Sequence, residues 1–433
     1  MHPDERVFGE PGDEVTSDTN PLSRDGCLLI LGSLDILGIV LAGILAIPAL
    51  VLAMECLAAL LPAPLRASGA GERPRVAILM PAHNEESVLA ATLGSIVPQL
   101  SGADRLVLVA DNCTDATAGV ARGFDRVDVI DRTDAGRRGK GHAIAFGIDH
   151  LRQNPPDILV MLDADCIAGA GAIDALVRQV QVSDRPAQGL YLMQLPNNPG
   201  LKDRLSTFAF LVKNHVRPRG LDRLGLPCLL TGCGMAFPWR TIEKIPMDHA
   251  NLVEDMQMGI DLTMRGSAPR FCESAALSGQ LPPAGAAAVR QRTRWEHGHL
   301  LTMIKQTPRL LIATLRGKFA SLPVAAELCV PPLSLYLVLL MLGLTAAAIA
   351  LAMGRSHWPM TILLATSLLT FVMMLVTAAR FGRGVLSPYM LLLAPFYLIW
   401  KLPIYARFLF RPQKQWIRTE RENERTKEEV ASG

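Results

Sequence analysis

The sequence predicts a mixed α/β domain with a mostly parallel sheet, held at both of its ends by transmembrane helices. Three observations predict it: short β-branched runs alternate with helical stretches, long apolar stretches carry no charge, and the composition is strongly apolar. Hydrophobic residues make up 50% of the 433 residues and charged residues 19%, against about 25% charged in soluble domains. A chain of this length can hold two or three domains.

The first membrane-spanning stretch is residues 36–54, and two more lie at 333–353 and 358–379; none contains a charged residue. A bilayer core of about 30 Å needs roughly 20 helical residues, so each can span it. Residues 385–400 are uncharged but shorter, and they contain Pro388 and Pro395. The polar, acid-leaning N-terminus does not resemble a signal peptide.

Arginine placement predicts the orientation, because cytosolic loops are enriched in arginine and lysine. Arg66, Arg73 and Arg75 follow the first span, so we expect the middle of the chain in the cytosol. Two further spans return the chain to the cytosol at Arg380 and Arg383, and the residues after 400 are basic. Residues 385–400 should therefore be re-entrant or lie flat; a third span with the tail outside is the alternative.

These boundaries predict five segments in a multi-pass protein of the inner (cell) membrane. They are a polar N-terminal segment (1–26), a transmembrane helix (27–62), a cytosolic α/β domain (66–320), a C-terminal membrane region (328–400) and a basic amphipathic tail (401–433).

Within the α/β domain, strands are expected at 76–80, 105–110, 127–130 and 158–162. Helices are expected between them, at 87–99, 114–123 and 142–152. Such alternation gives a parallel sheet with helices on both faces.

Composition and motifs exclude several classes of protein. A net charge of +3 is too small to indicate a nucleic-acid partner. The eight cysteines lack CxxC spacing and are interpreted as small buried hydrophobes in a reducing compartment. No Walker loop is present, and Gly139 and Gly141 lack the third glycine of a dinucleotide fingerprint.

Polar residues follow three of the expected strands. Pro81 to Glu85 follow the first, Asp111 the second, and Asp163 and Asp165 the fourth. Parallel sheets bind ligands at the carboxyl ends of their strands, so we expect these groups to meet at one edge.

Asp163 and Asp165 are separated by one residue, and in an extended segment such residues point the same way. Two adjacent carboxylates repel unless a cation lies between them, and Mg²⁺ or Mn²⁺ prefers oxygen ligands. The alternative for an isolated pair is a polar strand exit with a helix cap.

Residues 137–141 (RRGKG) precede a predicted helix. Their glycines allow close approach of the backbone, and the cations and helix N-terminus favour an anion such as a diphosphate. Alone, such a basic loop is more often simply solvated.

Two further motifs follow, VED at 253–255 and QRTRW at 291–295. With the spaced aspartates in this order, residues 76–300 resemble the inverting family 2 glycosyltransferases with a GT-A (Rossmann-like) fold. The resemblance is to the membrane-embedded branch that includes cellulose, hyaluronan and chitin synthases and ceramide glucosyltransferase.

The resemblance implies a role for each residue. Donor-binding residues would be Pro81, Glu85, Asp111, Lys140 and Asp163, with Asp111 at the nucleotide base. Asp163 and Asp165 would hold Mg²⁺ or Mn²⁺ against the donor diphosphate. Asp255 would be the general base, its pKa raised by Glu254. Gln291, Arg294 and Trp295 would contact the diphosphate and the acceptor.

Each of these residues also has a structural interpretation. Asp255 at the start of a helix could serve only the helix dipole. Trp295 could be an interfacial anchor. His297 and His299 are interpreted as structural residues, because their spacing does not suit metal binding from a helix.

The expected partners are a nucleotide-sugar donor (a UDP-sugar, with GDP not excluded), a saccharide or lipid-linked acceptor, membrane lipids and possible polysaccharide export proteins. We expect a hexosyltransferase that builds extracellular polysaccharide. The alternative is transfer of one sugar to a membrane lipid, polyprenyl-linked or ceramide-like, because Val253 replaces the threonine often found in polymer-making relatives. A transporter is disfavoured because the spans at 333–353 and 358–379 lack ionisable residues, and a non-catalytic scaffold because every expected acid is present.

Overall fold

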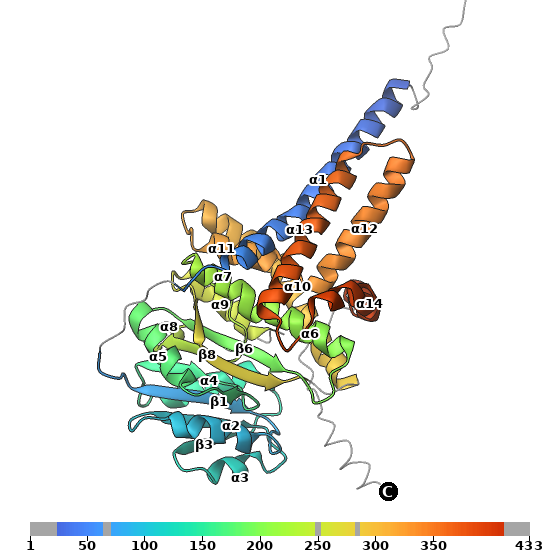
Figure 1. Ribbon diagram of the computed structural model, residues 1–433. Coiled ribbons are helices and arrows are strands. Elements are labelled where there is room, and N and C mark those ends of the chain that lie inside the picture. Colours follow the sequence, from blue (N-terminus) through green and yellow to red (C-terminus); the bar gives the residue numbers. More distant parts are fainter. Residues whose placement is uncertain (1–23, 64–70, 247–252, 282–285, 411–433) are drawn as a thin grey trace, which may run out of the picture.

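The computed structural model describes residues 24–63, 71–246, 253–281 and 286–410. It contains an α/β domain and a group of long helices that extend away from it (Figure 1). Most of the predicted N-terminal segment (1–26) and of the predicted tail (401–433) lies outside the described residues.

The four predicted strands form one half of an eight-stranded sheet whose order is β3-β2-β1-β4-β7-β6-β8-β5. All four are parallel. They are β1 (Val76–Ala82), β2 (Arg105–Asp111), β3 (Val127–Arg132) and β4 (Ile158–Met161). The strands β1 and β4 are buried almost throughout, as their continuous apolar runs predict for parallel strands.

The second half of the sheet is mixed. It consists of β5 (Ile167–Ala168), β6 (Ala187–Gln194), β7 (Met235–Pro238) and β8 (Arg270–Gln280). β7 is antiparallel to β4 and β6, and β8 is parallel to β6 but antiparallel to β5. The expectation of a mostly parallel α/β sheet is confirmed.

Helices cover both faces of the sheet, as predicted. One face packs against α2 (Leu89–Ile96, continued by a 3₁₀ turn at Val97–Gln99) and α5 (Ala172–Ser183), with α3 (Thr117–Arg122) beside β3. The other face packs against α4 (Lys140–Leu151), α8 (Trp239–Ile242) and α9 (Glu254–Met264). Alternate residues of β1 enter the two cores, Ile78 and Met80 on one side and Ala77 and Leu79 on the other, because successive strand side chains point to opposite faces.

Among the described residues, four helices are long and apolar enough to span a membrane, over Gly32–Ala58, Leu333–Ala352, Trp358–Phe381 and Pro388–Phe408. They belong to α1 (Arg24–Ala58), α12 (Leu333–Ala352), α13 (Trp358–Phe381), and a 3₁₀ turn (Pro388–Leu393) followed by α14 (Ala394–Phe410). The first three run along one another, whereas α14 lies across their base beside α6 (Figure 1). α14 continues through residue 400, where the sequence predicts the end of the membrane region.

A layer of helices joins the sheet to the long helices. It contains α6 (Leu201–Leu211), a π-helical turn (Val212–Val216), α7 (Arg217–Arg223), α10 (Ala286–Leu315) and α11 (Ser321–Cys329). α7 crosses α1 so closely that a Cβ at Gly220 would lie 2.0 Å from the carbonyl oxygen of Glu55. Beside this crossing, Arg217 Nε lies 2.5 Å from Glu55 Oε2, and both side chains are buried. The sheet and the membrane helices are therefore joined by close packing and a buried ion pair.

Candidate active site

A cavity of about 1030 Å³ follows the carboxyl ends of β1, β2 and β4 and extends to the membrane helices. Every site residue predicted from the sequence lines it. These are Pro81, Glu85, Asp111, Lys140, Asp163, Asp165, Glu254, Asp255, Gln291, Arg294 and Trp295. The expectation that the polar strand ends meet at one edge is confirmed, and the two later motifs join them there.

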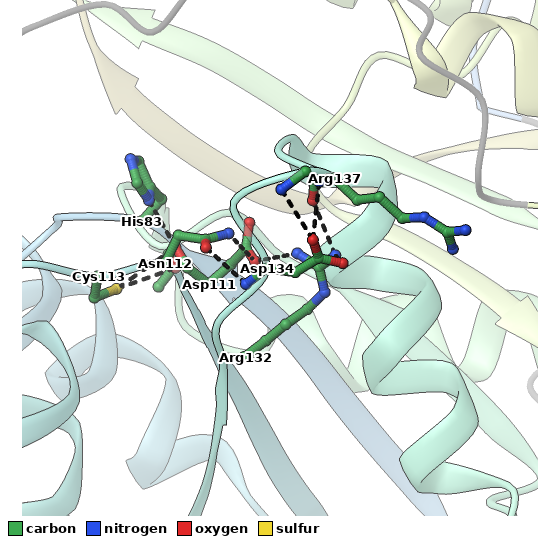
Figure 2. A network of polar contacts seen from close by, with 9 residues as sticks. His83, Asp111, Asn112, Cys113, Arg132, Asp134 and Arg137 are labelled. Atoms are coloured by element: carbon green, nitrogen blue, oxygen red, sulfur yellow. Dashed lines mark hydrogen bonds and ion pairs between the residues drawn. The ribbon is translucent and has the colours of Figure 1, made fainter.

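At one end of the cavity Asp111 is fixed from several sides (Figure 2). Its Oδ1 accepts hydrogen bonds from Arg132 Nη1 at 2.5 Å and Asn112 Nδ2 at 2.9 Å, and the side chain is almost fully buried. Arg132 also donates to Asp134 Oδ2 at 3.1 Å and to the Arg137 carbonyl at 2.9 Å. Arg132, which is held by Asp111, thus fixes the start of the 137–141 loop.

Arg132 is a residue of this site that the sequence analysis did not single out. The register of the sheet places it directly beside Asp111 on the neighbouring strand. The signal in the sequence is a charged residue at the end of an apolar strand, next to a strand that ends in an acid.

The Asp163–Asp165 motif differs from its predicted geometry. β4 ends at Met161, and the Cys166 N–H donates to the Asp163 carbonyl at 3.2 Å, so the motif forms a turn. The expectation of an extended segment is wrong, because the chain must turn here to enter β5. Both carboxylates nevertheless line the cavity, Asp165 as an exposed residue.

The donor set suits a hard cation. Asp163, Cys166 and Cys233 have possible ligand atoms within 4.8 Å of one another, but burial raises the pKa of the Cys166 thiol well above its usual range. A protonated thiol is a poor ligand. The carboxylate oxygens of Asp163 and Asp165 are therefore the groups that fit Mg²⁺ or Mn²⁺.

Lys140 links the 137–141 loop to this motif. It is the first residue of α4, and its ammonium group forms an ion pair with Asp163. Its Nζ also donates to the Gly232 carbonyl at 3.1 Å. Burial opposes the charged form of Lys140, but the carboxylates of Asp163 and Glu254 outweigh it and raise the Lys140 pKa above its usual range. Lys140 therefore remains a cation inside the cavity.

Asp255 and Glu254 begin α9 and face the same cation. Burial raises the pKa of both carboxyls, and Lys140 opposes that rise in each. Burial is the main cause of the raised Asp255 pKa, rather than the Glu254 charge expected from the sequence, and Asp163 is a like charge that adds to the rise. A Cβ at Gly232, which has φ 93°, would lie 3.1 Å from Asp255 Oδ2, so only glycine leaves this approach open.

The QRTRW motif lies on α10. Burial lowers the pKa of Arg294, and the carboxylates of Glu254 and Asp255 oppose this shift, so the guanidinium lies within electrostatic range of these acids. The Trp295 ring lies 6.4 Å from that of Phe210, which lies 5.8 Å from that of Tyr191. All three rings line the cavity.

His297 packs against α14, where its Nε2 lies 3.0 Å from the Ile404 carbonyl oxygen. This contact fits its structural interpretation. His299, in contrast, lines the cavity.

The far end of the cavity is formed by the candidate membrane helices and their connections, which sequence reasoning did not connect to the site. Its lining includes Leu52 of α1, Tyr397 and Lys401 of α14, and residues 330–334 at the start of α12. A single cavity therefore joins the carboxylates to apolar surfaces of the membrane region.

Comparison with known proteins agrees with this architecture. Residues 74–298 match the family described as "Glycosyltransferase like family 2". The chain is 27% identical over 241 residues to the probable glycosyltransferase YdaM of Bacillus subtilis, covering 54% of this chain and 57% of that protein. It is 36% identical over 108 residues to a 4,4'-diaponeurosporenoate glycosyltransferase of Staphylococcus aureus, covering 24% of this chain and 28% of that protein.

A solved structure shares the fold. It is the mannosyltransferase PcManGT from Pyrobaculum calidifontis in complex with GDP-Man and Mn²⁺, with a TM-score of 0.53 and 19% identity. The similarity covers 88% of this chain and 100% of that one. The family match spans more than half of the chain and contains every motif of the site, so the chain belongs to glycosyltransferase family 2 and has a GT-A fold.

Proposed function

We propose that this protein transfers a sugar from a nucleotide sugar, with a UDP-sugar as the expected donor, to an acceptor that enters the site from the membrane. The observation that carries this proposal is the continuous cavity. It is lined by Asp163, Asp165 and Asp255 at one end and by Leu52 and Tyr397 of the membrane helices at the other. An acceptor with a lipid tail can thus reach the carboxylates while its tail remains near the bilayer.

The donor diphosphate is proposed to lie between the metal-binding pair and the cations of the cavity. Asp163 and Asp165 would hold Mg²⁺ or Mn²⁺, which supplies charge stabilisation to the departing nucleotide. Lys140 and Arg294 would neutralise further phosphate charge. PcManGT holds GDP-Man with Mn²⁺, which supports this arrangement and keeps GDP as an alternative to UDP.

Asp255 is proposed as the general base. Its carboxylate takes the proton of the acceptor hydroxyl as that oxygen forms a bond to the anomeric carbon. The bond between the anomeric carbon and the diphosphate oxygen breaks, and the nucleoside diphosphate leaves with the electron pair. One displacement inverts the anomeric centre, and no covalent intermediate on the enzyme is needed.

The lining of the cavity favours a lipid-linked saccharide as the acceptor. Tyr191, Phe210 and Trp295 present aromatic surfaces next to the acids, which suits a sugar ring, and the apolar lining at Leu52 and Leu333 suits a lipid tail. The curated relatives do not supply the acceptor, because the chain spans only 57% and 28% of their lengths.

Repeated addition that builds an extracellular polysaccharide is the second candidate. The observation that favours it is the placement of Gln291, Arg294 and Trp295 in the cavity, since this motif is typical of the polymer-making enzymes that the chain resembles. A cytosolic site in the inner membrane fits both candidates and remains a prediction from the arginine distribution.

One experiment separates these proposals. Purified full-length enzyme in nanodiscs with Mn²⁺ is supplied with UDP- and GDP-sugars, and both nucleoside diphosphate release and product length are measured. We expect release that depends on the metal and a single added sugar on a lipid-linked saccharide. A ladder of oligomers would favour the second candidate, and the absence of release with every donor would refute sugar transfer.

A further inference from the structure

A π-helical turn interrupts the helical segment that borders the cavity. Residues Val212–Val216 form this turn between α6 and α7. Such turns are rare, are found frequently at functional sites and change the direction of the side chains around them. Here Lys213 and Asn214 of the turn, and Arg217 immediately after it, line the cavity.

Three other cations that line the cavity each form an ion pair with an acid, and Lys213 differs from them in this respect. Lys140 is paired with Asp163, Arg217 with Glu55, and Lys401 with Glu296. In the part of the chain that the structure describes, no hydrogen bond or ion pair is found for the Lys213 ammonium. Burial lowers the Lys213 pKa, and the Asp255 carboxylate opposes this shift. A cation in such surroundings is stabilised when a ligand supplies an anion.

Two further polar atoms, in residues that line the cavity, also lack partners within the described part of the chain. Asn214 Oδ1 and His299 Nε2 make no hydrogen bond to any described residue, although each residue is only 4% exposed. Burial lowers the His299 pKa to about 3, and the charges of Lys213 and Arg217 add to this shift, so the ring is neutral. An amide oxygen accepts hydrogen bonds, and so does the nitrogen of a neutral imidazole that carries no proton. Buried polar atoms are usually hydrogen-bonded, so this pair leaves two unsatisfied acceptors among the described residues.

We propose that Lys213, Asn214 and His299 form the headgroup subsite for the acceptor, a membrane lipid whose headgroup carries both an anionic oxygen and hydroxyl groups. This inference rests on the proposed function and specifies its acceptor. Lys213 binds the anionic oxygen, and Asn214 and His299 accept hydrogen bonds from the hydroxyls. A phosphate-linked saccharide on a polyprenyl chain and a glycerol phospholipid share this chemistry.

The position of Lys213 relative to Asp255 adds a constraint. The two groups line the same cavity and interact electrostatically, so an anion bound at Lys213 would lie within electrostatic range of the proposed general base. A hydroxyl next to that anion can then reach Asp255 while the lipid tail lies along Leu52 and Leu333, which line the same cavity.

The test uses full-length enzyme in phosphatidylcholine nanodiscs with Mn²⁺ and its donor. Three probes are compared: a polyprenyl-diphosphate-linked monosaccharide, phosphatidylglycerol, and diacylglycerol as a neutral lipid with a hydroxyl. For the preferred anionic probe, Lys213→Met should raise the acceptor KM at least tenfold. KM of the same variant for the neutral probe diacylglycerol should change less than twofold. Lys213→Arg keeps the positive charge, so its acceptor KM should stay close to the wild-type value. Lys305→Met, which removes an exposed lysine from α10, is the matched control and should change neither value.

Asn214→Leu and His299→Leu should raise the acceptor KM for all hydroxyl-bearing probes. Each variant removes a hydrogen-bond acceptor without changing the charge of the subsite. Higher wild-type turnover with the polyprenyl probe than with phosphatidylglycerol would assign the anion to a lipid-linked saccharide, and the reverse would assign it to a phospholipid. An equal loss of kcat with neutral and anionic probes in Lys213→Met would overturn the proposal, because Lys213 would then act only through Asp255. If the wild-type enzyme hydrolysed no donor, that result would instead refute the proposed function itself.

Discussion

Lys140 forms an ion pair with Asp163 across the carboxyl edge of the sheet, so the basic loop and the acidic motif neutralise each other. The Lys140 ammonium is therefore paired with a carboxylate that a divalent cation would use as a ligand. The balance between this ion pair and a bound metal leads to the first prediction.

Lys140→Met should raise the affinity of the donor-free enzyme for Mn²⁺ by about tenfold, because the competing ammonium is removed. Turnover should fall by about 10- to 100-fold, because a cation near the diphosphate is lost. Isothermal titration with Mn²⁺ and donor hydrolysis measure the two effects, and Lys305→Met serves as the control. Unchanged Mn²⁺ affinity would show that Lys140 does not compete for Asp163.

Asp165→Ala should abolish metal-dependent donor binding, since one of two carboxylate ligands is lost. Chelation of the wild-type enzyme with EDTA should have the same effect, and Mn²⁺ should reverse it. Donor affinity is measured by titration with and without metal. Retention of full affinity by the variant in Mn²⁺ would rule out Asp165 as a ligand.

Asp255→Asn should bind the donor normally yet lose transfer by about 10²–10⁴-fold, the usual contribution of a general base. Comparison of donor Kd with kcat for transfer separates the two effects. Normal turnover in this variant would exclude Asp255 as the base.

The pH profile gives an independent test of the same residue. Burial raises the Asp255 pKa, and only the deprotonated carboxylate accepts a proton. Activity should therefore fall on acidification at a pH above the usual range of an aspartate, and it should be fully present at higher pH. The pH at which kcat/KM for the acceptor falls on acidification measures this pKa. A fall at the usual pKa of an aspartate would contradict the effect of burial.

Arg217→Met should destabilise the protein by about 3–5 kcal/mol, because it leaves the buried Glu55 carboxylate without its partner. The double variant Glu55→Leu with Arg217→Met should recover part of this loss. Thermal unfolding in detergent measures both. The exposed pair of Arg240 and Asp184 is the control, and Arg240→Ala should cost about 1 kcal/mol or less.

A protease-cleavable tag after Gly433 should stay protected in sealed vesicles that keep the cytosolic face inside. The reason is that α14 lies across the base of α12 and α13 (Figure 1), which favours the prediction of a segment that does not cross. Cleavage of the tag in intact vesicles would mean that residues 385–400 span the membrane.

The sequence by itself determined the four parallel strands β1 to β4 and the acids at their ends, whereas β5 to β8 were not predicted. Continuous apolar runs such as Val76–Ala82 form buried parallel strands, and the carboxyl ends of such strands meet at one edge by geometry. For the same reason Asp111 and Asp163 could be placed in one site before any contact was known. Three of the four candidate spans were also predictable, because the uncharged stretches of bilayer length within them are a local property.

Only the tertiary structure decided which residues distant in sequence share the cavity. Arg132 lies beside Asp111 because of strand register, and the turn at Asp163–Asp165 follows from the path into β5. Lys213 and His299 belong to separate helices that meet only when the sheet packs against the membrane helices. Their side chains carry no local pattern that distinguishes them from ordinary polar residues, because their burial and lack of partners arise from the packing of the whole chain.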